Sequence, residues 1–271
     1  MLLLSWNVNQ RRPGDQAKKI KSVGPLPDIV TLQEVRRNHA DEWADHLKDI
    51  GLRHHYRSGE KALTLKHQCL IASHWKLTPD DIVRPREAPY PESLGRATVS
   101  VPGNGDIDVF TAHIPNGDKN GWRKIDTFRV LAAELCRAND SPCILTGDFN
   151  EPKWFEDSGQ IVTFEEYEDG NWRDDFGDER PRIEWIKGVR SVLDEAESQH
   201  GLRDAYRSPL GSKEPYPVTF HQPPAYPRCF DHTFVSRHFE VLGCDYHHEW
   251  REREGLSDHS PMWAELRLLT A

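Results

Sequence analysis

Residues 143–150 read Cys-Ile-Leu-Thr-Gly-Asp-Phe-Asn, a short apolar run followed by a glycine and two polar residues. The run Cys143–Thr146 predicts a buried β-strand, and Asp148 and Asn150 follow where that strand would end. In α/β folds, groups just past strand ends converge on one crevice. The stretch therefore predicts a buried strand and marks a place where polar side chains would gather.

The same arrangement recurs along the chain. Other apolar runs predicted as strands also carry polar residues at one end: Asn7 and Asn9 after Leu2–Trp6, Glu34 after Ile29–Leu32, His113 and Asn116 after Ile107–Ala112, Asp231 within Phe230–Val235, and Asp258 and His259 before Pro261–Leu266. If these strands share an edge, all of these polar residues would meet there.

The rest of the chain predicts helices that cover the strands. Helical spacing or stop signals mark residues 15–23, 40–50, 122–137 and 183–200, and further strands are predicted over 69–73, 97–101 and 241–246. Pro102-Gly103-Asn104-Gly105 predicts a hairpin turn. Strands both with and without intervening helices indicate mixed sheets covered by helices, an α/β or α+β arrangement. No linker divides the 271 residues, so a single domain over residues 1–271 is predicted.

Charge is concentrated in one segment. The chain has 35 Lys and Arg against 44 Asp and Glu, a net charge of −9, and residues 156–180 alone carry ten acids and two bases. This predicts a solvated acidic insertion at about 156–180, with an electrostatic gate as the alternative. Basic residues near two strand ends are compatible with a locally basic cleft: Arg11, Arg12, Lys18, Lys19, Lys21, Arg36 and Arg37.

Several protein classes are disfavoured. No stretch of about 18 apolar residues predicts a membrane span, and the opening Met1-Leu2-Leu3-Leu4 lacks a basic leader. The five cysteines are scattered without a C-x-x-C pair, which fits neither a disulfide framework nor a zinc cluster. We expect a reducing, cytoplasmic setting; the oligomeric state is open, and a monomer is assumed.

The strand-end residues predict a metal site. Each has an ordinary explanation when taken singly: Asn7 as a cap, Glu34 as a solvated acid, Asp148 and Asn150 as turn residues. Together, carboxylates crowded at one edge would repel one another unless a cation lay between them. The oxygen donors Glu34, Asn7 and Asp258 suit Mg²⁺ or Mn²⁺ better than zinc. Such a site favours attack by water on an anionic phosphoryl group.

Six short motifs carry a family resemblance. They are Ser5-Trp6-Asn7-Val8-Asn9, Leu32-Gln33-Glu34-Val35, Thr111-Ala112-His113-Ile114-Pro115-Asn116, Gly147-Asp148-Phe149-Asn150, Phe230-Asp231-His232 and Ser257-Asp258-His259-Ser260-Pro261. Their sequence and order resemble the motif series of the endonuclease/exonuclease/phosphatase superfamily, which has the DNase I-like fold. One motif alone is weak, but six in order from residue 5 to residue 261 are specific.

The resemblance implies a four-layer sandwich of two mixed β-sheets flanked by helices, with metal-dependent phosphoester hydrolysis at one edge. It implies Glu34 as the main metal ligand, helped by Asn7 and Asp258 with Asn9 nearby. It further implies that Asp148 activates water, that Asn150 fixes this water or a phosphate oxygen, and that His259, held by Asp231, stabilises the transition state. His113 and Asn116 would hold the scissile phosphate.

The resemblance leaves the substrate open. The motifs at residues 6–9 and 114–117 look closest to the exonuclease III and abasic-site endonuclease branch, which implies DNA or RNA. Phosphate contacts would then come from basic residues such as Arg11, Arg12, Arg36, Lys119 and Arg123. Three positions depart from that branch: Gln10 replaces its usual Gly, Arg228-Cys229-Phe230-Asp231-His232 replaces its aromatic-Arg-aliphatic lead into an Asp-Tyr pair, and His113 replaces a frequent Tyr.

Two alternatives follow from these departures. One is a hydrolase of a small phosphoester, such as a nucleotide, a sugar or inositol phosphate, or a lipid head group. The other is a non-catalytic binding module on the same fold. The presence of Glu34, Asp148, Asn150, Asp231 and His259 argues against the module, because a binding protein needs no residue that activates water.

Overall fold

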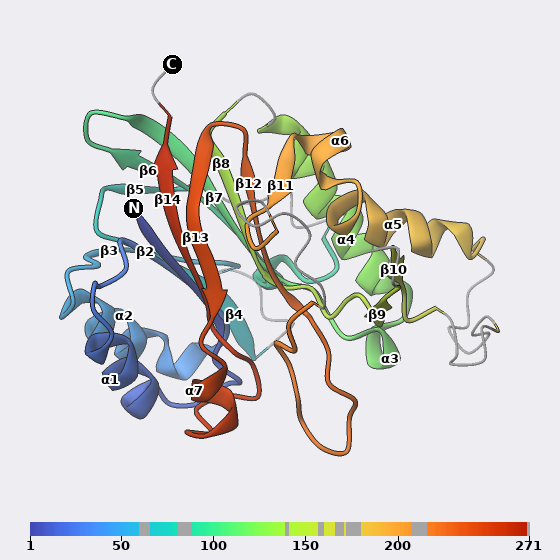
Figure 1. Ribbon diagram of the computed structural model, residues 1–271, viewed down its shortest axis with the longest axis horizontal. Coiled ribbons are helices and arrows are strands. Elements are labelled where there is room, and N and C mark those ends of the chain that lie inside the picture. Colours follow the sequence, from blue (N-terminus) through green and yellow to red (C-terminus); the bar gives the residue numbers. More distant parts are fainter. Residues whose placement is uncertain are drawn as a thin grey trace.

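Two six-stranded sheets stack face to face, with helices on their outer faces (Figure 1). The computed structural model describes residues 1–59, 66–80, 88–138, 141–156, 160–165, 171, 180–207 and 216–269. The first sheet has the order β13-β14-β1-β2-β4-β3 and consists of β1 (Leu2–Asn7), β2 (Ile29–Arg36), β3 (His54–Arg57), β4 (His67–Ser73), β13 (Phe239–Tyr246) and β14 (Met262–Leu268).

The second sheet has the order β11-β12-β8-β7-β6-β5. Its strands are β5 (Leu77–Asp80), β6 (Leu94–Val101), β7 (Gly105–His113), β8 (Cys143–Asp148), β11 (Leu202–Asp204) and β12 (Asp231–Ser236). A separate two-stranded hairpin pairs β9 (Trp154–Phe155) with β10 (Ile161–Val162). Strands from both ends of the chain lie together in the first sheet.

Each large sheet contains one parallel pair, so both sheets are mixed, as predicted. β1 runs parallel to β2, with Asn7 opposite Gln33. β7 runs parallel to β8, with His113 opposite Asp148. Parallel neighbours end at the same edge of a sheet, so the residues that close these four strands are delivered to two adjacent edges.

The interior between the sheets changes from apolar to polar toward that edge. Side chains that alternate along a strand share one face, and the inward faces of β1, β2, β7 and β8 begin with Leu3, Ile29, Val109 and Ile144 in one buried cluster. Two residues further along, the inward side chains are hydroxyls: Thr31 and Thr146 lie 2.8 Å apart across the sheets. Thr111 accepts a 3.0 Å hydrogen bond from Gln33. The site residues come next.

Amphipathic helices cover the outer faces (Figure 1). On the first sheet, α1 (Gly14–Ser22) and α2 (Ala40–Lys48) pack Ile20, Trp43 and Leu47 against β1 and β2. On the second sheet, α4 (Trp122–Arg137) and α5 (Ile183–Leu193) bury Phe128 and Trp185. Shorter elements complete the chain: the 3₁₀ turns η1 (Arg37–His39) and η2 (Pro91–Ser93), and the helices α3 (Gly117–Asn120), α6 (Ala196–His200) and α7 (His248–Glu252). The four-layer sandwich is thereby confirmed.

The prediction of one helix over residues 183–200 is wrong in detail. The helix ends at Leu193, and a second one begins at Ala196 after Glu195 adopts a non-helical conformation. The break turns Ala196 into the core and brings the His200 ring 3.0 Å from the Ser191 carbonyl. The strands β3, β5, β9, β10 and β11 were not predicted, because runs of two to four residues carry almost no periodic signal.

Most of the acidic segment lies outside the described residues. Of the predicted insertion at 156–180, the structure describes 156, 160–165, 171 and 180. Within this segment Ile161 and Val162 are buried and form β10, which pairs with β9. The solvated insertion as a whole stays a prediction. The five cysteines are free thiols, and all but Cys136 are buried. None of the helices in the described parts of the chain combines the length and the apolar character of a membrane-spanning segment.

Gly147 gives a direct test of how β8 fits beside β7. A Cβ at this position would lie 2.0 Å from the Ala112 carbonyl oxygen, and the residue has a φ of 153°. We expect Gly147→Ala to destabilise the protein by at least about 3 kcal/mol, because steric overlap and backbone strain add. Urea denaturation measures the change. Gly14→Ala is the matched control, since a Cβ there meets nothing within 4 Å; equal stability of the two variants would contradict this account.

Candidate active site

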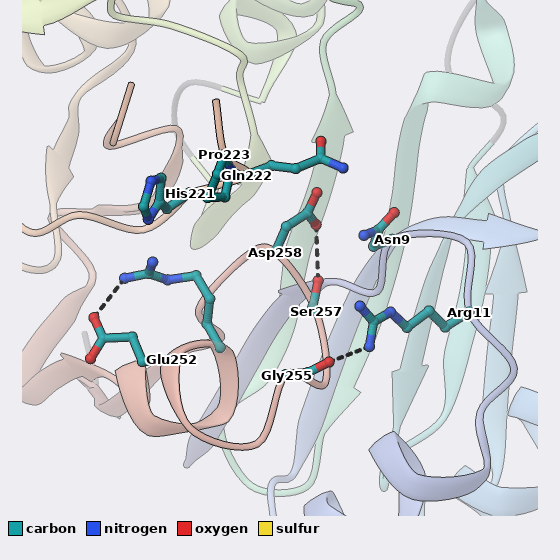
Figure 2. Close-up of a pocket in the computed structure, with 10 residues that line it drawn as sticks. Asn9, Arg11, His221, Gln222, Pro223, Glu252, Gly255, Ser257 and Asp258 are labelled. Atoms are coloured by element: carbon teal, nitrogen blue, oxygen red, sulfur yellow. Dashed lines mark hydrogen bonds and ion pairs between the residues drawn. The ribbon is translucent and has the colours of Figure 1, made fainter. Parts of the chain in front are cut away.

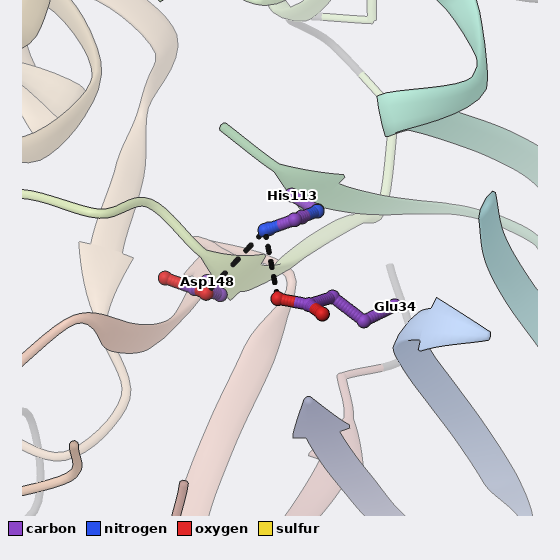
Figure 3. A group of neighbouring side chains, drawn as sticks. All are labelled: Glu34, His113 and Asp148. Carbon is purple, nitrogen blue, oxygen red and sulfur yellow. Dashed lines mark ion pairs between the residues drawn. The ribbon is translucent and has the colours of Figure 1, made fainter. Parts of the chain in front are cut away.

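Three strands bring Glu34, His113 and Asp148 together at the polar edge. Figure 3 shows their side chains pointing toward one another from β2, β7 and β8. His113 Nε2 lies 3.4 Å from Glu34 Oε1 and 3.7 Å from Asp148 Oδ2. The ligand atoms of these three residues all lie within 4.8 Å of one another. The strand-end pattern in the sequence therefore corresponds to a real cluster.

Asp148 is the centre of this cluster and is almost completely buried. Its Oδ1 accepts a 2.9 Å hydrogen bond from the backbone N–H of Asn150. Its Oδ2 accepts a 2.8 Å bond from the Asn7 amide, and His259 Nε2 lies 3.6 Å away. Burial raises the pKa of Asp148 to about 7, although the positive charge of His259 opposes the shift. The carboxylate is thus oriented and has the proton affinity of a base that works near neutral pH.

A second group joins His259 to Asp231 and Asp148. Asp231 opens β12 directly opposite Asp148 in the sheet, and its carboxylate lies 2.9 Å from His259 Nδ1. The Trp6 indole N–H also donates to the His259 carbonyl oxygen. Burial disfavours the charged imidazole, but the carboxylates of Asp231 and Asp148 outweigh it and raise the pKa of His259 to about 10. At neutral pH this ring is a buried cation.

His113 has the opposite protonation state. Burial lowers its pKa to about 4, and the charge of Glu34 does not compensate. Glu34 itself stays ionised: burial favours its neutral form, but the His113 ring and hydrogen bonds from Gln10 and Asn7 hold its pKa below the usual range. The site therefore pairs a neutral imidazole on the Glu34 side with a cationic one on the Asp231 side.

The backbone around the site is strained. The described non-glycine residues with positive φ are Asn9 (49°), Gln10 (55°), Glu34 (56°) and Asn150 (50°). Glu34 lies in an irregularity of β2, where the pairing with β4 shifts register between Leu32 and Val35. Such conformations cost about 1–3 kcal/mol each and persist only where the surroundings enforce them. A bulge of this kind re-aims a side chain, here the carboxylate of Glu34.

A buried ion pair supports the turn that carries Asn150. The Lys124 ammonium, on the inner side of α4, donates a 2.7 Å bond to the Asn150 carbonyl and lies 2.9 Å from Glu151 Oε1. Both side chains are essentially inaccessible to solvent. Sequence reasoning missed this pair. Its signal was a lysine on the apolar face of a helix, beside Ile125 and Phe128.

Two further contacts of the cluster were also missed. Gln10 Nε2 donates a 2.8 Å hydrogen bond to Glu34 Oε2. The ring of His67, from β4, lies 5.2 Å from that of His113. Gln10 was noted in the sequence only as a departure, without this contact, and nothing in the sequence around His67 distinguishes it from the other histidines.

Of the remaining predicted residues, Asn7 contacts this cluster directly, whereas Asn9, Asn116 and Asp258 are not among the clustered ligand groups. Asn9 and Asp258 line an adjoining open pocket of about 400 Å³ (Figure 2), together with Arg11, His221 and Gln222 among others. Asn116 is exposed and caps α3, where its side-chain oxygen accepts a 2.7 Å bond from Asp118 N–H. Asn7 joins both carboxylates through its amide nitrogen, and its oxygen accepts from Asn9 N–H.

The chemistry of these donors fits a hard divalent cation. Two carboxylates, Glu34 and Asp148, face the same neutral imidazole, and a positive ion between them would offset their repulsion. Amide and carboxylate oxygens of Asn9 and Asp258 line the adjoining pocket. Such oxygen donors suit Mg²⁺ or Mn²⁺. The arrangement as a whole offers a base, a cationic imidazole and a cation site within one small volume.

Comparison with solved structures agrees with the fold. The 3′ phosphatase NExo from Neisseria, bound to a product DNA hairpin, aligns with a TM-score of 0.68 and 21% identity, over 98% of this chain and 99% of that one. An AP endonuclease from Archaeoglobus fulgidus aligns with a TM-score of 0.66 and 19% identity, over 99% and 100%. ANGEL2, a 2′,3′-cyclic phosphatase in complex with adenosine-2′,3′-vanadate, gives 0.66 and 18%, over 98% and 95%.

Comparison at the level of sequence identifies the family. No curated protein sequence matches the chain. The profile of the Endonuclease/Exonuclease/phosphatase family, however, matches residues 4–259, which include all ten predicted site residues. Because this match spans nearly the whole chain and the fold agrees with it, the chain belongs to the Endonuclease/Exonuclease/phosphatase family of phosphoester hydrolases.

Proposed function

We propose that this protein is a divalent-metal-dependent phosphodiesterase that cleaves nucleic acid, DNA or RNA. The observation that carries the proposal is the position of Asp148, a buried carboxylate between the cationic His259 and the Glu34–His113 pair. Hydrolysis of a phosphodiester needs a base for water and positive charge around the phosphoryl oxygens. Both requirements are met within one cluster.

Each predicted residue has a part in this scheme. Glu34 and Asp258, with Asn7 and Asn9, would hold Mg²⁺ or Mn²⁺, which when bound supplies positive charge to the phosphate oxygens. Asp148 orients water and takes its proton, while Asn7 and Asn150 fix the carboxylate. His259, held by Asp231, balances the negative charge that develops. His113 and Asn116 contact the scissile phosphate from the side of β7.

The pocket beside Asp258 supports a substrate longer than a single phosphate group. Its volume of about 400 Å³ is within the range of small-molecule sites, and Arg11 and His221 lie on its wall. Three of the basic residues compatible with a basic cleft, Lys18, Lys19 and Lys21, pair with acids on the surface. NExo bound to DNA has the same fold, which adds support.

A small phosphoester is the second candidate. The specific observations that favour it are His113 and Gln10, which depart from the abasic-site branch, and the fold shared with the cyclic phosphatase ANGEL2. A single domain over residues 1–271 with an acidic insertion near 156–180, a monomeric state and a cytoplasmic location belong to the same proposal.

The substrate class is tested by measuring turnover of a panel of nucleic acids and small phosphoesters. We expect cleavage of plasmid DNA, abasic or 3′-phosphorylated oligonucleotides, or RNA, with an apparent KM that rises steeply with salt.

Arg11→Ala should raise KM about fivefold or more with kcat unchanged, because it removes binding of phosphate that is equally strong in the ground state and the transition state. Arg267→Ala is the control, since Arg267 pairs with Glu240 on β13, away from the pocket. Turnover confined to nucleotides, sugar or inositol phosphates or phosphocholine, with a flat salt response, would replace the nucleic-acid proposal with the second candidate.

The role of Asp148 is tested by an isosteric change. Asp148→Asn keeps the size of the side chain but removes its ability to accept a proton, so kcat should fall by about 10³-fold or more. The assay uses whichever substrate of the panel is turned over fastest. Asp106→Asn, on an exposed position of β7, is the matched control and should keep full activity. Near-normal turnover by Asp148→Asn would remove Asp148 from the reaction.

The cation requirement is tested by chelation. EDTA should silence the enzyme, and Mg²⁺ or Mn²⁺ should restore it, because the clustered carboxylates hold a cation that the reaction needs. Turnover is measured before chelation, after it, and after titration with each ion. Full activity in EDTA is the result that refutes a metal-dependent reaction.

A further inference from the structure

Gln10 has a backbone conformation that its residue type does not favour. Its φ is 55°, and the preceding Asn9 is also left-handed at 49°. Glycine adopts this region freely and asparagine tolerates it, whereas glutamine has no such preference. A glutamine at this position therefore needs a reason that the backbone does not supply.

The Gln10 side chain supplies one. Its amide nitrogen donates a 2.8 Å hydrogen bond to Glu34 Oε2. The other oxygen, Oε1, accepts from Asn7 at 3.2 Å and faces His113 at 3.4 Å. Glu34 sits in a bulge of β2 and is left-handed itself, so no regular strand pairing orients it. Gln10 is the partner of Oε2, and it reaches across from the loop after β1.

We propose that Gln10 is a positioning residue, which holds Glu34 in the orientation that binds the divalent cation. The inference rests on the proposed function, because it takes Glu34 as a ligand. Hydrogen bonds to a ligating carboxylate fix its rotamer, and losing such a partner typically weakens metal affinity by about 10- to 100-fold. Gln10 would thus strengthen metal binding while its own backbone conformation opposes folding.

Gln10→Gly separates these two effects, because it removes the amide and relieves the backbone. We expect the affinity for Mn²⁺, measured by calorimetry on the full chain, to fall about tenfold. The melting temperature in EDTA should stay the same or rise by up to about 4 °C. If Gln10 had a purely structural role, its replacement would lower the melting temperature without a specific loss of Mn²⁺ affinity.

Gln10→Asn is the matched variant. It keeps an amide and suits the left-handed region, but its side chain is one methylene too short to reach Glu34 Oε2. It should behave like Gln10→Gly. Mn²⁺ affinity within twofold of the parent for both variants would overturn the proposal, and so would a melting temperature in EDTA several degrees below that of the parent.

The parent chain and Glu34→Gln are titrated with Mn²⁺ first. This step distinguishes a failure of the proposed metal site from a failure of the positioning role of Gln10. Weaker binding by Glu34→Gln establishes Glu34 as a ligand, and the Gln10 variants then test the positioning role. Equal binding by the parent and Glu34→Gln contradicts the metal site of the proposed function and, with it, any role of Gln10 there. Unchanged affinity in the Gln10 variants alone overturns only the present inference.

Discussion

In each of the two facing sheets, one pair of neighbouring strands runs parallel, and both pairs end at the same edge of the sandwich. Parallel neighbours deliver their last residues side by side, so Asn7 and Gln33 meet in one sheet and His113 and Asp148 in the other. β12 enters the second sheet antiparallel and adds Asp231 opposite Asp148. Without these registers, Asn7, Asp148 and Asp231, which are up to 224 positions apart in sequence, would not meet at one edge. The strand pairing is thus the condition for the contacts among these strand residues, and the loops after β1 and before β14 add Gln10 and His259.

The inward side chains of these strands change from apolar to polar along the strand, and this change links stability to function. Their inward side chains run from an aliphatic cluster through a layer of threonine hydroxyls to the carboxylates and imidazoles. Burial of apolar surface at one end offsets the desolvation of ionisable groups at the other. Left-handed Asn9, Gln10, Glu34 and Asn150 add strain at the polar end. A site that is unfavourable by itself is therefore held by the rest of the sandwich.

Much of this arrangement could be predicted from strand ends, and the limits have physical causes. Asp148 and Glu34 were found because polar residues directly after apolar runs converge whenever the strands share an edge. Lys124 was missed because helical periodicity shows which face of the helix a residue occupies. It does not show that a buried acid from another segment, here Glu151, pairs with it. Gln10 was noted only as a departure, since the φ that makes it unusual cannot be read from residue type. The helix over 183–200 was joined across Asp194 and Glu195 because a two-residue break leaves the apolar spacing almost intact.

The two carboxylate contacts of the His259 ring differ, so that one ring nitrogen is fixed and the other stays available. Nδ1 lies 2.9 Å from Asp231, a hydrogen bond that sets the ring orientation and stabilises its charge. Nε2 lies 3.6 Å from Asp148, which is too far for a hydrogen bond. The two carboxylates beside the ring therefore differ in kind: Asp231 holds the proton on Nδ1, while Asp148 attracts the ring without binding Nε2. Under the proposed function, the Nε2 proton is therefore the one that a phosphoryl oxygen would accept.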